Sequence, residues 1–170
     1  MPTDPQASSP SPLDAPLRAG DAAPGFRLPT VGGEADLAGF AGRALVLYFY
    51  PKDDTPGCTK QAVGFSERLA EFEAVGAAVL GVSRDTLAKH ERFAAKHDLA
   101  VTLGSDEAGA ASEAYGVWKE KAMYGRTYMG IERSTFLIGP DGRIERVWRK
   151  VRVPGHVDEV LDAVRALAIG

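Results

Sequence analysis

Apolar and polar residues follow each other along this chain with the periods of strands and helices. Residues 44–50 (ALVLYFY) are a nearly continuous apolar run that Pro51 ends, which predicts a buried and central strand. From 59 to 75 apolar residues recur every three or four positions, which predicts an amphipathic helix ended by Gly76. A second buried strand is expected at 77–82 (AAVLGV). A strand, a helix and a strand in this order form a parallel crossover unit.

The rest of the chain repeats such elements in a different order. We expect a hairpin at 26–37 around Gly-Gly, a helix from Thr86 to His97, a strand at 101–106, a short helix at 107–116, a hairpin of 134–139 and 143–151 around Pro-Asp-Gly, and a last helix from about Pro154. This order predicts an α/β thioredoxin-like fold, with a central mixed β-sheet flanked by helices and an N-terminal extension. An open doubly wound sheet is the alternative, but the closing hairpin argues against it, because such sheets continue with parallel crossovers.

Composition and charge limit the possible partners. The 170 residues suit one domain, expected at 17–170, after a disordered tail at 1–16 rich in Pro, Ser and Ala. A net charge of −3 indicates no broad basic surface for nucleic acid. Because no apolar stretch approaches the roughly 18 residues of a membrane span, we expect no membrane partner. A single cysteine and no secretory signal predict a cytoplasmic protein.

The chain's only cysteine lies where a strand passes into a helix. Cys58 follows the polar residues 52–57 (KDDTPG), between the end of the predicted strand and the first turn of the predicted helix. Free N–H groups and the positive end of the helix dipole gather there, and they favour the nucleophilic thiolate. A buried inert cysteine is the alternative, but it would suit a position within the apolar strand better. The environment therefore favours a reactive thiol.

The neighbours of the cysteine add to this chemistry. Thr55 places a hydroxyl three residues before Cys58, close enough to fold back onto it. Pro51 and Pro56 stiffen the loop, and Gly57 lets the backbone approach a small ligand. These residue types are also ordinary in turns, so the loop alone does not indicate a substrate.

The stretch FYPKDDTPGCTKQA resembles the active-site loop of the peroxiredoxins, whose Pro-x-x-x-Thr-x-x-Cys pattern it contains. Its surroundings are similar to the peroxiredoxin Q group, also called bacterioferritin comigratory proteins. Further matching stretches are GVSRD (81–85), YGVW (115–118), MYGRTYMGIERSTFLIGPDGRI (123–144) and HVDEVL (156–161). The resemblance covers residues 20–168.

The resemblance implies a role for each residue of this motif. Cys58 would attack the peroxide O–O bond and become a sulfenic acid. The Thr55 hydroxyl would hydrogen-bond thiolate and peroxide, Pro51 would shield the site, and Gly57 and Cys58 would contact the substrate. The family's arginine matches Arg133, and no metal or organic cofactor is implied.

Two other arginines compete with Arg133 for the place beside the sulfur. Arg84 and Arg126 also lie in matching stretches, and the sequence does not exclude either of them. By itself, Arg133 would be read as a surface charge at the start of a strand.

The chain departs from the family at the resolving cysteine. Val63 and Ala94 stand at the two positions where the second cysteine commonly lies. An external thiol must therefore reduce the sulfenic acid: a thioredoxin, a glutaredoxin, a small thiol, or Cys58 of another copy. We expect a monomeric thiol-dependent peroxidase acting on hydrogen peroxide and organic hydroperoxides, with a weak homodimer as the other state.

Two other functional classes stay open at this point. In a redox sensor, oxidation of Cys58 would change binding to a partner, with little turnover. A thioredoxin-fold binding module without redox activity is disfavoured by the joint presence of Pro51, Thr55, Cys58 and Arg133. His90 and His97 lie seven apart on one predicted helix, and we expect a solvated helix surface there in preference to a metal site.

Overall fold

The computed structural model describes residues 16–169, so the tail predicted at 1–16 lies outside the described residues except for Pro16. The strands are β1 (Arg27–Thr30), β2 (Gly33–Asp36), β3 (Ala44–Phe49), β4 (Ala77–Ser83), β5 (Thr102–Ser105), β6 (Trp118–Met123), β7 (Arg126–Ile131), β8 (Ser134–Ile138) and β9 (Ile144–Trp148). The helices are the 3-10 helix η1 (Leu37–Phe40) and the α-helices α2 (Pro56–Ala74), α3 (Leu87–His97), α4 (Ala110–Ala114) and α5 (His156–Ile169).

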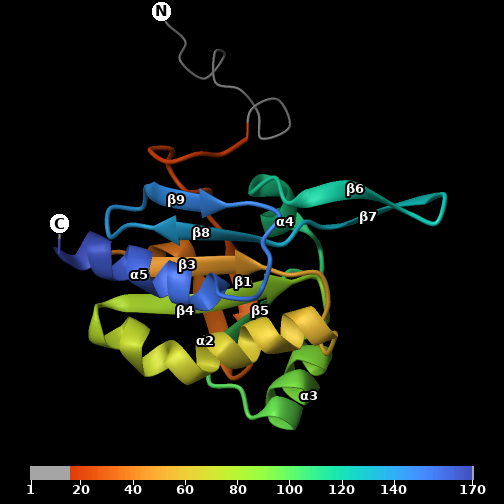
Figure 1. Cartoon of the computed structure of the whole chain (residues 1–170), viewed down its shortest axis with the longest axis horizontal. Helices are drawn as coiled ribbons and strands as arrows, with labels where there is room; N and C mark the ends of the chain where they lie inside the picture. The colour runs from red at the N-terminus through yellow and green to blue at the C-terminus, as the bar shows by residue number, and fades with distance from the viewer. Residues whose placement is uncertain (1–15, 170) are drawn as a thin grey trace, which may run out of the picture.

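Seven strands form one mixed sheet in the order β2-β1-β5-β4-β3-β8-β9 (Figure 1). β3, β4 and β5 are parallel, as the predicted crossover requires, while β8 and β9 return antiparallel. The predicted thioredoxin-like fold with a central mixed sheet is confirmed. β3 pairs with β4 on one side and β8 on the other, so the carboxyl end of β3 lies in the middle of the sheet edge.

The apolar run of β3 is buried on both faces of the sheet. Val46 and Tyr48 point into a core shared with α2 and α5, whereas Leu47 and Phe49 point into a second core against α4 and β8. α2 contributes Phe65 and Phe72 to the first core, both fully buried. Burial of each such ring stabilises the fold by roughly 2–3 kcal/mol, which fixes α2 firmly on the sheet.

The ends of several elements depend on local chemistry. α2 begins at Pro56, three residues before the predicted start, because proline suits the first helical position and Thr55 takes the extended N-cap conformation. α3 begins as predicted, with the Thr86 hydroxyl accepting a hydrogen bond from the Lys89 amide. The helix expected at 107–116 is only five residues long, and β9 ends at Trp148, before the predicted 151.

A third hairpin, formed by β6 and β7, was missed by the sequence pattern. It makes a separate two-stranded sheet that projects beyond the main sheet (Figure 1). Because both faces of its outer part are exposed, its residues lack the alternation that marks a half-buried strand. Among residues 16–169, no helix combines the length and the apolar character needed to cross a membrane.

Candidate active site

Cys58 is buried near the N-terminus of α2, just past the carboxyl end of β3. Thr55 is the N-cap of the helix, and Cys58 is its third residue. Its backbone N–H belongs to the first turn, where no helical carbonyl is available, so the positive end of the helix dipole lies at the sulfur. The side chain packs with Tyr48 and Phe65 and is 1% exposed, so bulk water is largely excluded.

Arg133 supplies a cation directly to this sulfur. Its Nη2 donates to Cys58 Sγ at 3.3 Å, and its Nη1 donates to Gln61 Oε1 at 2.6 Å. Gln61 lies one helical turn after Cys58 and is fully buried. The two bonds fix both arms of the guanidinium, so one nitrogen is held on the sulfur.

Gly57 allows this approach. A Cβ atom at Gly57 would lie 3.2 Å from Arg133 Nη2, so a side chain would press on the guanidinium. The two competing arginines lie elsewhere. The Arg84 guanidinium stacks on the Trp118 ring at 3.8 Å, and Arg126 is exposed on β7.

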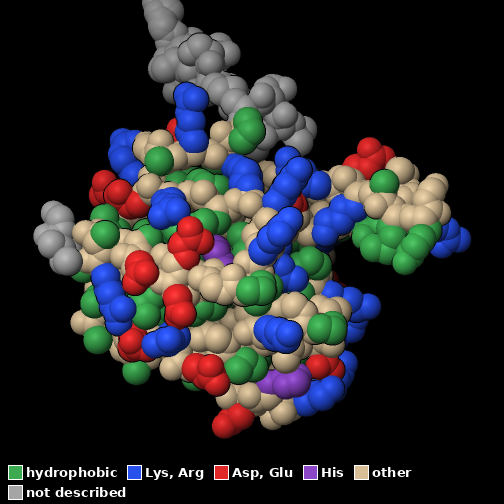
Figure 2. All heavy atoms as spheres, in the orientation of Figure 1, with side chains coloured by type: hydrophobic (Ala, Val, Ile, Leu, Met, Phe, Trp, Pro, Cys, Tyr) green, Lys and Arg blue, Asp and Glu red, His purple; other side chains and the backbone are tan. Residues whose placement is uncertain are grey.

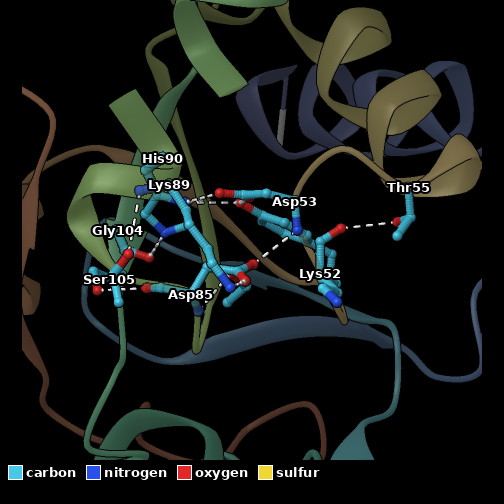
Figure 3. Close-up of polar contacts among 11 residues, drawn as sticks. Lys52, Asp53, Thr55, Asp85, Lys89, His90, Gly104 and Ser105 are labelled. Atoms are coloured by element: carbon cyan, nitrogen blue, oxygen red, sulfur yellow. Dashed lines mark hydrogen bonds and ion pairs between the residues drawn. The ribbon is translucent and has the colours of Figure 1, made fainter. Parts of the chain in front are cut away.

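Thr55 and Pro51 frame the loop of residues 50–57, which we call the catalytic loop. The Thr55 hydroxyl donates to the Lys52 carbonyl at 2.8 Å (Figure 3). A hydroxyl has one proton, so in this arrangement it does not donate to the sulfur, although its lone pairs stay free to accept. Pro51 is exposed at the start of the loop. The expected contact from Thr55 to Cys58 therefore requires the hydroxyl to rotate.

A buried polar network holds the catalytic loop on α3. Asp53 accepts from the Tyr50 hydroxyl at 2.5 Å, and its other oxygen lies 2.6 Å from His90 Nδ1. His90 Nε2 donates to the Gly104 carbonyl at 2.9 Å, since a carbonyl can only accept. His90 is fully buried, so the prediction of a solvated surface was wrong for this histidine. The buried carboxylate of Asp53 determines the environment of His90, and no local sequence pattern indicates this pairing.

The same loop is tied at two further points. The Asp53 amide donates to the Asp85 carboxylate at 2.7 Å (Figure 3). The same carboxylate also accepts from the Ser83 hydroxyl at 2.7 Å. On the surface, Asp54 pairs with Lys96 at 2.7 Å and His97 at 2.9 Å, and these two partners lower the pKa of Asp54. His90 and His97 thus do share a face of α3, and that face holds the catalytic loop.

His156, the third histidine, lies at the start of α5 under the site. Burial is the main cause that lowers the pKa of His156 to about 4, with the Arg133 and Arg146 charges adding to it. Its Nε2 lies 2.8 Å from the Thr135 hydroxyl. Within residues 16–169, no cluster of three or more His, Cys, Asp or Glu side chains has the arrangement of a metal site.

Sequence reasoning missed Gln61, Asp53 and His90 as parts of the site. The position of Gln61 gave a weak signal. Residues three apart on a helix share a face, and Gln61 lies three residues after Cys58. Its amide nitrogen is buried without a hydrogen-bond partner in the structure. Nothing local links Asp53 to His90, because they are 37 positions apart in the chain.

The arrangement suits nucleophilic attack by sulfur on a polar bond. The guanidinium and the helix N-terminus both stabilise the thiolate and any negative charge that develops beside it. Exclusion of water strengthens these interactions. A small ligand that reached the sulfur would meet the Arg133 guanidinium beside it.

Comparison with known proteins agrees with this geometry. Residues 19–147 match the model of the AhpC/TSA family. The chain is 50% identical over 137 residues to peroxiredoxin Bcp of Xanthomonas campestris, covering 81% of this chain and 86% of that protein. It is 47% identical over 148 residues to peroxiredoxin Bcp of Escherichia coli, covering 86% and 95% respectively.

Solved structures show the same likeness. The peroxiredoxin Q of Xylella fastidiosa, solved as a cysteine-to-serine mutant, superposes with a TM-score of 0.86 at 43% identity, covering 91% of this chain and 99% of that one. The bacterioferritin comigratory protein of Xanthomonas campestris, solved to study its alkyl peroxide reduction activity, gives a TM-score of 0.80 at 49% identity over 84% and 92% of the two chains. Mutants of two different cysteines of the Xanthomonas campestris protein have also been solved, whereas the present chain has one cysteine.

Proposed function

Because this chain belongs to the AhpC/TSA family, as a peroxiredoxin of the Bcp or Q kind, we propose that Cys58 is the nucleophile of its thiol-dependent peroxidase activity. The observation that carries the assignment is the 3.3 Å contact from Arg133 Nη2 to the buried sulfur. Pro51, Thr55 and Gly57 form the peroxide pocket with Cys58, and Gln61 positions Arg133.

The first half of the reaction follows from this geometry. The Cys58 thiolate gives an electron pair to the nearer peroxide oxygen, an S–O bond forms and the O–O bond breaks. The departing oxygen takes a proton and leaves as water or an alcohol, and the sulfur becomes a sulfenic acid. Negative charge moves onto the departing oxygen, where the Arg133 N–H groups and a rotated Thr55 hydroxyl can stabilise it.

The second half needs a thiol from outside the chain. With one cysteine, no internal disulfide can form. We propose that a thioredoxin, a glutaredoxin or a small thiol reduces the sulfenic acid, and that the protein acts as a monomer. A compartment that keeps Cys58 reduced, the cytoplasm, is the proposed setting.

Peroxide consumption, measured with thiol reductants supplied one at a time, tests this function. We expect many turnovers per Cys58 when a suitable thiol is present. A protein that consumes one equivalent of peroxide and then stops with every thiol would be a redox sensor, the alternative function.

A further inference from the structure

The β6–β7 hairpin carries most of the large hydrophobic side chains that the described residues expose. Four of the five lie on it: Met123 (54% exposed), Tyr124 (96%), Tyr128 (46%) and Met129 (48%). The fifth, Val31, lies in the β1–β2 turn. Figure 2 shows hydrophobic side chains gathered on the projecting hairpin, with Lys and Arg near its base. Grouped exposed hydrophobic residues on one projection indicate a surface that contacts another molecule.

The tip of the hairpin has a residue that does not serve the fold. Tyr124 and Gly125 form the two-residue turn with φ of 53° and 76°. Such a turn prefers Asn or Gly at its first position, and a bulky side chain there is strained. Because the Tyr124 ring is almost wholly exposed, no packing within the chain offsets this strain.

The charge of the hairpin differs from that of the whole protein. Residues 118–131 contain Lys119, Lys121 and Arg126 and only one acid, Glu120, which gives +2 in a chain of net charge −3. Tyr, Met and Arg are the residue types enriched at protein interfaces. The surface therefore fits a partner with an apolar patch and an acidic rim.

The hairpin also lies next to the reacting sulfur. β7 ends at Ile131, two residues before Arg133. Lys121 lies across from Tyr128, and a Cβ atom at Gly130 would lie 3.3 Å from Lys121 Cδ, so this side chain runs along the hairpin towards its base. Burial and, after it, the Arg133 guanidinium lower the pKa of Lys121. A molecule seated on the Tyr128 side of the hairpin would lie near Arg133, and so near the sulfur that Arg133 contacts.

Resting on the function proposed above, we propose that the β6–β7 hairpin is the docking surface for a protein dithiol reductant of thioredoxin type, with an apolar patch around its cysteines and an acidic surface. One reductant thiolate attacks Cys58 Sγ of the sulfenic acid, and the hydroxyl leaves as water with a proton. The second reductant thiolate then attacks the first reductant sulfur, releasing the Cys58 thiolate and the oxidised reductant.

Other occupants fit the same surface less well. A small thiol gains little from an exposed apolar ribbon 14 residues long. In a symmetric pair of two copies, each hairpin would face another hairpin of the same positive charge, which opposes close pairing. A lipid surface does not reduce a sulfenic acid.

The test compares two reductants on the intact protein. One assay follows NADPH oxidation with purified bacterial thioredoxin and its reductase, and the other follows peroxide loss with dithiothreitol. The variant Tyr124→Asn removes the ring and introduces a residue that the turn favours, and Met123→Ser is added in a double variant. We expect kcat/KM for thioredoxin to fall about tenfold in the double variant, as at interface aromatic anchors, with dithiothreitol turnover unchanged.

A matched control makes the result specific: Val31→Ser removes an exposed apolar side chain elsewhere and should leave both assays unchanged. A further variant tests the charge of the hairpin. Arg126→Gln should lower the rate with thioredoxin and make that rate less dependent on salt, without changing the rate with dithiothreitol. Equal thioredoxin kinetics in wild type and double variant would overturn the docking surface, as would turnover of wild type with dithiothreitol but not with thioredoxin. The proposal would also be overturned if the double variant kept its thioredoxin kinetics but lost self-association or binding to anionic vesicles. A second copy or a lipid surface would then be the occupant. A wild type inactive with every thiol would instead refute the proposed function.

Discussion

The catalytic loop and the β6–β7 hairpin lie at the same end of the molecule and differ in almost every physical respect. The loop is short and is held by hydrogen bonds to α3, to Asp85 just after β4 and to its own residues, and it leads directly to the buried sulfur of Cys58. The hairpin has exposed faces, and beyond its base it is held mainly by its own ladder. Reaction with a small peroxide needs fixed atoms and little water, whereas contact with a large partner needs exposed surface.

Gln61 and Lys121 show how the two regions meet at Arg133. Gln61 holds one guanidinium arm from inside the protein, and on the hairpin side the Arg133 charge, after burial, lowers the pKa of Lys121. A change in the loop should therefore alter the reaction with peroxide, while a change in the outer hairpin should alter only reduction by a protein partner. The variants below test that separation.

The largest effect is expected at Cys58. Cys58→Ser should lower peroxidase activity by at least about 10³-fold, because a serine hydroxyl is far less nucleophilic at neutral pH and nothing else in the site replaces the thiolate. Peroxide consumption with dithiothreitol measures the loss, and circular dichroism checks the fold. Full activity in this variant would refute the assigned nucleophile.

Asp53 and Asp54 are neighbours in the catalytic loop, but Asp53 has its partners in the interior and Asp54 has its partners on the surface. Asp53→Asn removes the carboxylate that faces Tyr50 and His90 in the interior, so we expect the free energy of unfolding to fall by about 3–5 kcal/mol. Asp54→Asn breaks only exposed ion pairs, and Asn tolerates the positive φ of 62° at this position, so its effect should be far smaller. Urea unfolding compares the two variants. Equal losses would mean that the buried network does not hold the loop.

Removal of the cation beside the sulfur should slow the chemical step. Arg133→Met should lower the rate constant for oxidation by hydrogen peroxide about 10²–10³-fold, since it removes a donor from charge that develops in the transition state. Arg126→Met, on the exposed hairpin, serves as the control and should leave this rate within about twofold of wild type. Rapid mixing with peroxide in the absence of a reductant isolates the step. Similar rates for both variants would place the catalytic cation elsewhere.

A smaller effect is expected from His156 as the pH changes. Its folded pKa of about 4 lies below the usual value of 6.5, so between these values the unfolded chain binds a proton that the folded protein excludes. The stabilisation is complete above pH 6.5 and falls as the pH drops towards 4, by at most about 3 kcal/mol. Urea unfolding at several pH values measures the slope. His156→Gln should flatten it, and an unchanged slope would assign the effect to other groups.

The local sequence predicted much of the fold because its patterns report local structure. The apolar run of β3, the helical stripe of α2, the Thr86 cap and the Pro-Asp-Gly turn each depend on residues within a few positions of one another. The place of Cys58 between strand and helix follows in the same way. The β6–β7 hairpin gave no such signal, because an element exposed on both faces does not need an apolar stripe.

The contacts that make the site reactive were decided only in three dimensions. The sequence alone left Arg84, Arg126 and Arg133 as candidates, and it gave no reason to pair His90 with Asp53. Arg133 reaches Cys58, 75 positions away, because β8 pairs beside β3 and brings the residue before β8 to the N-terminus of α2. Strand order depends on how whole faces of the sheet are buried, and no short stretch of sequence contains that information.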